Sequence, residues 1–488
     1  MRKPIATASR PPVLFLFVLL ITVGTFAAIA YFRAGPLNSL LLILASIAPA
    51  VLIVPVLALR PDFDSFEPLS FVLLSVLIGV TARTYLLVVD GNPELVAFLL
   101  PGKPLSILLR GMAVIVSGLA AFALGYFIAV PRIPLGRLRA LREDFHRRRL
   151  AVVLLPITAI SVVSVVLFMR ATGGWTSVRE GVISDIRPVA VPGSAHWAAL
   201  GYYRYGSELA LYAYCCVLAA IVPRRASRSM LWTAATVGLG LLAAMLPFLA
   251  SSRTDALLII VVTALVFHYA RGRLRIRHIA FAAALGMAGF AVMGTLRAEV
   301  RAPSFQTAPG VTGRIEQIIG TRHWLGVDKT SLIVDAVPTS LPYQWGRTLV
   351  TWVTAPIPRT IWPSKGLVAI GPIIAERIYG LNSLTTGVPP GLVAELYWNF
   401  GWAGVLAGMF LFGVVLRVMY RSLRPLLLDG RPGAIVIYTV GVAPLALQLP
   451  ATEVSGAVIA FLMAVVPTYL MLEFVTASAS RWPGMSRT

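Results

Sequence analysis

The chain has 488 residues, of which 58% belong to the set AVILMFWYC and 13% are charged. Soluble domains are about 45 to 50% apolar and about 25% charged, so this composition excludes a soluble globular protein. In a soluble protein the formal charge of +22 would suggest nucleic acid, but here the basic residues must first be placed relative to a bilayer. The two cysteines, Cys215 and Cys216, are adjacent inside an apolar run, which excludes a disulfide framework or spaced metal ligands.

Long apolar runs predict an all-α polytopic membrane protein with about 12 transmembrane helices, since each crossing of the hydrocarbon core needs roughly 20 apolar residues. The first run follows the basic start MRKP, but it is long for a signal peptide and lacks a clear small-residue cleavage site, so we expect it to be retained. In chain order the runs are 12–32, 37–59, 69–89, 106–130, 150–169, 197–222, 230–250, 254–270, 279–296, 392–420, 434–449 and 455–475.

The positions of Lys and Arg predict the orientation, because short cytoplasmic loops carry the excess of these residues. With the amino terminus in the cytoplasm, the cytoplasmic segments hold 23 Lys and Arg and the short outer loops hold six. Seven of the 23 lie in residues 131–149. An even number of spans then returns the carboxyl terminus to the cytoplasm.

Residues 297–391 form a large outer segment between predicted spans 9 and 10, far longer than an ordinary connection. Its Trp, Tyr and Pro content argues against disorder and predicts a folded extracytoplasmic cap of short helices and turns. The predicted organisation is therefore a bundle of spans 1 to 9 in residues 1–296, this loop in 297–391, and spans 10 to 12 in 392–488.

Basic residues are concentrated in the outer segment, which has nine Lys or Arg and five acids. This surplus predicts a surface for an anionic substrate such as a phosphate group, because Arg binds phosphate oxygens in bidentate fashion. Contact with lipid headgroups and local ion pairs is the alternative. The nine are Arg297, Arg301, Arg314, Arg322, Lys329, Arg347, Arg359, Lys365 and Arg377.

Further charges lie within or beside the predicted spans, where they are costly. We expect Arg83 and Arg110 to extend to the outer headgroups. Arg204 and Glu208 are four residues apart on one helix and are expected to pair.

The turn SSRTD precedes a run that barely spans the hydrocarbon core. Arg253 is therefore expected at the outer interface, beside the positive end of a helix capped by Ser252 or Thr254. That arrangement predicts an outward-facing anion site, and a plain polar hairpin turn is the alternative.

Two later segments carry a family resemblance: IPRTIWPSK at 357–365, and GVPPGLVAELYWNFGWAGVLAGMFLFGV from Gly387. They resemble the signature of bacterial Wzy-type O-antigen polymerases, also called oligosaccharide repeat unit polymerases. In that family an outer loop carries a Pro-Arg and Pro-Lys element, followed by a helix with a Glu near its start and a Phe-Gly pair. SSRTDALL is similar to the family's turn of small residues and Arg before a span. The resemblance covers roughly residues 251–414.

The resemblance implies an enzyme that transfers a growing glycan from its polyprenyl diphosphate carrier to a lipid-linked repeat unit, at the outer face of the bacterial cytoplasmic membrane. Cations would stabilise the diphosphate leaving group, and the acceptor hydroxyl needs a general base. Glu395 is our first choice as base, with a structural salt bridge to an Arg as its alternative role; Asp255 and His323 are the other candidate bases. The predicted substrate-binding residues are Arg253, Arg359 and Lys365, then Arg297, Arg301 and Arg322.

The outer segments contain no Asp-x-Asp pair and no cluster with metal-ligand spacing, so we expect neither a metal nor a cofactor. Expected partners are the lipid-linked oligosaccharide and membrane lipids, with a chain-length regulator or a flippase as a further candidate and no nucleic acid. An O-antigen ligase-like transferase is the nearest alternative function. A flippase or other transporter is a second, which the confinement of cations to the outer half disfavours, and a structural membrane scaffold is a third.

Overall fold

The computed structural model describes residues 11–60, 63–172, 174, 195–222, 230–249, 253–272, 274, 319–320, 324–357, 361–362, 369–381 and 387–476. All regular elements within these ranges are helical. Seven helices are long and apolar enough to cross a membrane: Gly35–Leu59, Pro68–Asp90, Ile107–Phe127, Arg147–Ala171, Met230–Leu249, Leu392–Leu428 and Val454–Thr476. Two shorter apolar helices cover Leu258–Arg271 and Pro432–Gln448. The described chain is thus all-α with helices of membrane-spanning length, as the apolar runs predict.

The helix bounds follow the predicted runs closely. The run at 279–296 lies outside the described residues, so the count of twelve spans stays a prediction, as do the proposed domain limits. The long helices are α1 (Pro11–Leu59), α2 (Pro68–Val76) with its continuation to Asp90, α5 (Ile107–Phe127), α7 (Arg147–Ala171), α9 (Ala195–Ile221), α10 (Met230–Leu249), α11 (Arg253–Arg271), α17 (Leu392–Leu428), α18 (Pro432–Ile437) with α19 (Ala443–Gln448), and α20 (Val454–Thr476). Shorter helices are α4 (Pro93–Leu99), α6 (Arg139–Arg142), α14 (Val327–Ala336), α15 (Thr351–Thr354) and α16 (Gly371–Arg377).

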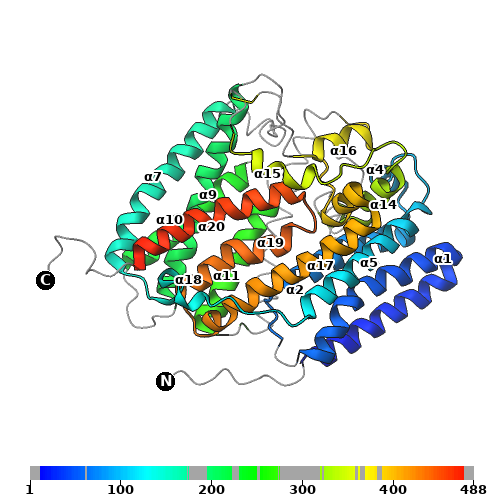
Figure 1. Cartoon of the computed structure of the whole chain (residues 1–488), viewed down its shortest axis with the longest axis horizontal. Helices are drawn as coiled ribbons and strands as arrows, with labels where there is room; N and C mark the ends of the chain where they lie inside the picture. Colours follow the sequence, from blue (N-terminus) through cyan, green and yellow to red (C-terminus); the bar gives the residue numbers. More distant parts are fainter. Residues whose placement is uncertain are drawn as a thin grey trace.

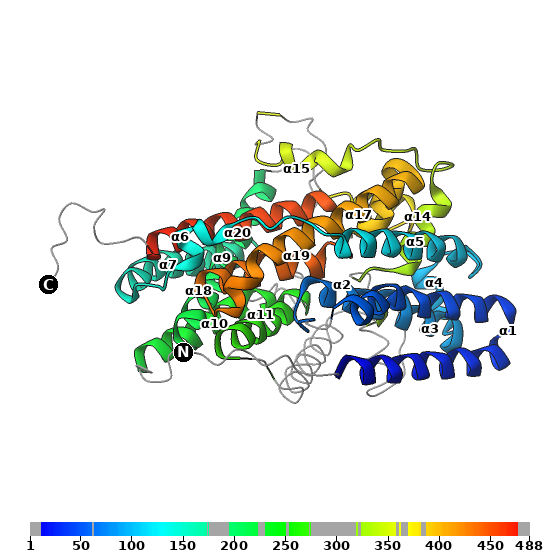
Figure 2. The same ribbon diagram turned by 60° about the horizontal axis from the view of Figure 1, so that its bottom comes forward.

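Helix α1 folds back on itself as two arms that lie side by side (Figures 1 and 2). The reversal occurs at Gly35, whose φ of 78° is readily adopted only by glycine, and Pro36 follows it. Two predicted spans, 12–32 and 37–59, therefore correspond to the two arms of one element.

Helices α5 and α17 form the most extensive helix pair of the bundle, and glycines allow their backbones to approach closely. A Cβ added at Gly125 of α5 would overlap the Phe410 carbonyl oxygen of α17. A Cβ at Gly413 of α17 would overlap the Phe122 carbonyl oxygen of α5. Both positions therefore need glycine, because the backbone of the opposite helix occupies the space that a Cβ would fill.

Because this crossing leaves no space, we expect Gly125→Ala to destabilise the protein by about 1 to 3 kcal/mol through overpacking. Gly136→Ala is the matched control, since nothing lies within 4 Å of a Cβ at that position. Thermal unfolding of both variants in detergent measures the difference. Equal unfolding temperatures for the two variants would contradict this prediction, because α5 and α17 could then move apart without loss of stability.

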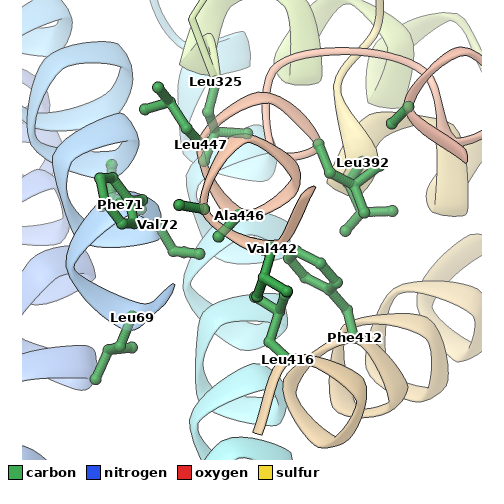
Figure 3. Close-up of a cluster of buried hydrophobic side chains, with 14 of the residues drawn as sticks. Leu69, Phe71, Val72, Leu325, Leu392, Phe412, Leu416, Val442, Ala446 and Leu447 are labelled. Carbon is green, nitrogen blue, oxygen red and sulfur yellow. The ribbon is translucent and has the colours of Figure 1, made fainter. Parts of the chain in front are cut away.

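The apolar core lies where α2, α17 and α19 meet. Figure 3 shows Phe71 and Val72 of α2 on the side of Ala446 and Leu447 of α19, and Val442 beside Leu416 and Phe412 of α17. The same cluster includes Leu325, from the predicted outer segment. Full burial of a large apolar side chain contributes about 1.5 to 3 kcal/mol to stability. Burial of Leu325 in this cluster therefore holds the segment before α14 inside the bundle.

The described part of the outer segment consists of short helices and turns, but α14 does not lie over the bundle as a cap. It packs against α5 and α17, and residues Val327–Val334 are all buried. A Cβ at Gly111 of α5 would overlap Ser331, and a Cβ at Gly79 would overlap the Leu325 carbonyl group. Glycines on two spans therefore make room for α14 and for the residue Leu325 before it, and α14 is a part of the bundle.

Candidate functional site

Of the nine predicted site residues, Glu395 is the one whose side chain the structure describes. Arg253 and Asp255 lie in the first turn of α11, where only the backbone is described. The other six lie outside the described residues: Arg297, Arg301, Arg322, His323, Arg359 and Lys365. The predicted convergence of these cations on Glu395 therefore stays a prediction.

Glu395 lies in the first turn of α17, which begins after Gly391. Gly391 has a φ of 84°, and its Cα faces the Pro450 carbonyl group so closely that a Cβ would come within 2.7 Å of the oxygen. The chain can therefore turn into α17 at this point only with glycine. The turn places Glu395 beside the start of α20.

The Glu395 side chain is fully buried. Its Oε2 accepts a hydrogen bond of 2.7 Å from the backbone N–H of Val454, the first residue of α20. The carboxylate thereby caps a second helix, whose positive end favours a negative charge. Its Oε1 is buried and accepts no hydrogen bond of good geometry from the described residues, although the Thr348 hydroxyl lies close enough to interact with the carboxylate. No ion pair to Glu395 occurs among the described residues either. The salt bridge considered as an alternative role is therefore absent from this part of the chain.

Asn399, one turn further along α17, fixes the segment that lies over Glu395. Its Nδ2 donates to Thr348 Oγ1 at 2.7 Å and to the Glu395 carbonyl oxygen at 2.8 Å, and its Oδ1 accepts from Gly346 N at 2.8 Å. Ser455 of α20 donates to the Thr348 carbonyl oxygen at 2.7 Å. The segment around Thr348 is thus bonded to both helices that hold Glu395.

The Phe-Gly pair of the family-like segment breaks α17. Phe400 has φ −140° and Gly401 has φ 60°, so neither residue is helical. The break releases carbonyl groups that an unbroken helix would use internally. Gln344 N donates to the Trp398 carbonyl at 3.1 Å and Trp345 N to that of Asn399 at 3.3 Å. The motif therefore has a structural role, which is to bind the 343–350 segment to the helix.

Lys329 is a second buried charge near this site. It is fully buried, and its Nζ donates to the Pro389 carbonyl at 2.8 Å and to the Ala451 carbonyl at 3.3 Å. It therefore joins α14 to the segments that precede α17 and α20. Although part of Glu453 remains exposed, burial of its carboxyl group raises its pKa, against the lowering effect of the Lys329 charge. The prediction that Lys329 belongs to an open basic surface is therefore wrong, because its side chain is buried.

Arg83 and Asp328 form a fully buried ion pair at the same end of the bundle. The Arg83 Nη1 lies 2.7 Å from Asp328 Oδ1, and its Nε and Nη2 donate to the Ile319 carbonyl at 3.0 and 2.6 Å. The prediction that Arg83 extends to the lipid headgroups is wrong, because an acid on α14 binds it inside the bundle. The cost of a charge within a span could have indicated that a partner acid was needed.

The local pair Arg204–Glu208 is confirmed, with 3.4 Å between Nε and Oε1. Within the described residues, no group of three or more His, Cys, Asp or Glu is arranged to hold a metal ion. The arrangement that remains for chemistry is a buried carboxylate with one anchored oxygen and one that accepts no hydrogen bond of good geometry from the described residues. A carboxylate of this kind can accept a proton.

The fold and this site define an all-α membrane protein with a buried acidic centre at one end of its helices. Comparison with family models, curated proteins and solved structures finds no match to the chain.

Proposed function

We propose that the protein is a metal-independent membrane glycosyltransferase that polymerises polyprenyl-diphosphate-linked oligosaccharide repeat units into a cell-surface polysaccharide, at the outer face of the bacterial cytoplasmic membrane. The resemblance of residues 357–365 and of the segment from Gly387 to Wzy-type polymerases supports this proposal. The observation that carries it is the state of Glu395, whose Oε2 is anchored by Val454 while Oε1 accepts no hydrogen bond of good geometry from the described residues.

In this mechanism a hydroxyl oxygen of the acceptor sugar attacks the anomeric carbon of the donor. The bond from that carbon to the diphosphate oxygen breaks, and the electron pair leaves with the diphosphate. The hydroxyl proton passes to Glu395 Oε1, which is the role of a general base. Arg253, Arg359 and Lys365 stabilise the charge that develops on the diphosphate. The Val454 N–H holds the carboxylate in one orientation during the transfer.

Access to Glu395 requires a movement, because the side chain has no solvent exposure. Thr348 belongs to the segment that leads through α15 to the IPRTIWPSK sequence. Displacement of this segment would break its bonds to Asn399 and Ser455 and open Oε1 to an acceptor hydroxyl. Binding of the donor diphosphate to Arg359 and Lys365, which follow this segment in the chain, would therefore be coupled to exposure of Glu395.

The test is an assay of the purified full-length protein, in nanodiscs, with lipid diphosphate-linked repeat units. We expect a ladder of products that differ by one repeat unit, and the same ladder after exhaustive chelation. Transfer to a different acceptor without a ladder would support the ligase-like alternative. A folded protein that forms no glycosidic bond would contradict the proposal, and loss of activity restored by magnesium would contradict metal independence.

A further inference from the structure

Three arginines gather at the opposite end of the bundle from Glu395. Arg60 follows the end of α1, and Arg417 and Arg421 lie one turn apart on α17. The guanidinium carbon of Arg417 lies 5.5 Å from the centre of the Tyr126 ring, which is fully buried near the end of α5. Arg60 and Arg421 are both within electrostatic range of Arg417. The three side chains come from two separate stretches of the chain and form one group around the end of α5.

Fixed contacts orient each arginine. The Arg421 Nη1 donates to the Val130 carbonyl oxygen at 2.6 Å. The Arg60 Nη2 lies 3.2 Å from Glu67 Oε2. Arg417 is stacked on Tyr126, and its Nε is buried without a hydrogen-bond partner among the described residues. The group is therefore preorganised, unlike arginines that extend freely into solvent.

The described acids near this group do not balance its charge. Arginine stays protonated in proteins, so the three side chains carry three positive charges. Asp64 is already engaged, with 3.2 Å to His268 Nε2 and a hydrogen bond of 2.9 Å from the Tyr269 hydroxyl. Burial raises the pKa of Glu67 to about 7, against the lowering effects of Arg60 and Arg417. Glu67, which is paired with Arg60, therefore supplies at most one negative charge against the three positive ones.

The arginines lie at the level where the lipid-facing surface ends. On α1, Leu59 is 62% exposed and directly precedes Arg60. On α17, the exposed apolar side chains include Leu411 and Val415, immediately before Arg417. Leu124 of α5 and Ile128, which directly follows the end of α5, are exposed on either side of the buried Tyr126. On these neighbouring helices the exposed apolar side chains end, and the arginines begin, at the same level of the bundle. This level corresponds to the depth of the lipid headgroups.

We propose that Arg60, Arg417 and Arg421 form a binding site for the phosphate of an anionic phospholipid, in the leaflet at this end of the bundle. The phosphate oxygens accept charge-assisted hydrogen bonds from the guanidinium groups. The acyl chains lie on the exposed apolar faces of α1, α5 and α17. In the predicted orientation this leaflet is the cytoplasmic one, whose anionic lipids attract basic groups.

The test is thermal unfolding of the full-length protein in neutral detergent with increasing phosphatidylglycerol. We expect the unfolding temperature to rise with the lipid, and to rise much less with phosphatidylcholine. Arg417→Gln and Arg421→Gln are each expected to weaken the apparent affinity for phosphatidylglycerol roughly tenfold or more. Lys103→Gln, which removes a positive charge from a partly exposed side chain outside the arginine group and outside the predicted anion-binding surface, is expected to respond as the unchanged protein does.

Equal stabilisation by the two lipids would overturn the proposal, as would an unchanged response in both glutamine variants. A third arm contains inorganic phosphate alone, and equal stabilisation there would show a site for free phosphate and overturn the lipid assignment. If the glutamine variants do not fold, the double variant Arg417→Lys with Arg421→Lys keeps the charge but removes the planar fork. Its apparent affinity should fall severalfold, and an affinity equal to that of the unchanged protein would overturn the site.

Discussion

Replacement of Glu395 by Gln is expected to reduce glycan elongation by about 10²- to 10⁴-fold, the usual contribution of a general base. Glutamine has nearly the same shape, and its carbonyl oxygen can still accept the hydrogen bond from Val454 N. It cannot take a proton from an acceptor hydroxyl at neutral pH. The expected result is therefore loss of turnover, with helix α20 still capped and the protein still folded. The measurement is the rate of repeat-unit addition to the lipid-linked product.

Glu376→Gln is the matched control, because Glu376 is exposed on α16 within the same predicted outer segment. It makes the same chemical change without touching the buried site, so elongation should stay within a factor of two or so. The thermal midpoint of Glu395→Gln should lie close to that of the control. Normal elongation by a folded Glu395→Gln variant would exclude Glu395 as the base and leave Asp255 and His323 as candidates.

The largest effect on stability is expected for Arg83→Met. This change removes the guanidinium that pairs with Asp328 and leaves a buried carboxylate without its partner charge. It also removes both hydrogen bonds to the Ile319 carbonyl. Breaking one side of a buried ion pair typically destabilises a protein by about 3 to 5 kcal/mol. We expect a loss of this size in the free energy of unfolding, measured by reversible denaturation in detergent.

The control for this variant is Lys103→Met. Lys103 and Asp335 also join a loop to α14 at 2.7 Å, but their side chains are 46% and 32% exposed. An exposed ion pair contributes about 0 to 1 kcal/mol. Lys103→Met should therefore lower the free energy of unfolding much less than Arg83→Met. The double variant Arg83→Met with Asp328→Leu should recover part of the loss, because no buried charge remains unpaired. A loss for Arg83→Met no greater than that for Lys103→Met would contradict the buried role of the pair.

Local features of the sequence predicted the helices well, because a membrane span is specified by residues that are adjacent in the chain. The apolar runs placed α5, α7, α10 and α20 to within a few residues. The pair Arg204–Glu208 was predicted because side chains four residues apart share one helix face. Gly391 and the Phe400–Gly401 pair were visible as part of a motif, although their backbone roles were not.

Long-range pairings could not be read in the same way. Arg83 and Asp328 are separated by 245 positions, and Glu395 and Val454 by 59. A single sequence does not specify which residues form a pair across such distances, because the partner depends on how the helices pack. For the same reason we expected a cap over the bundle and did not predict that α14 is buried within it.

The sequence by itself determined an all-helical chain of membrane-spanning elements and the positions of most of them, since hydrophobicity and helix length are local properties. Only the tertiary structure decided that Glu395 caps α20 with one oxygen while Lys329 and Arg83 are satisfied inside the bundle. Buried polar groups must find partners wherever the chain brings them, and that requirement is met by residues distant in sequence.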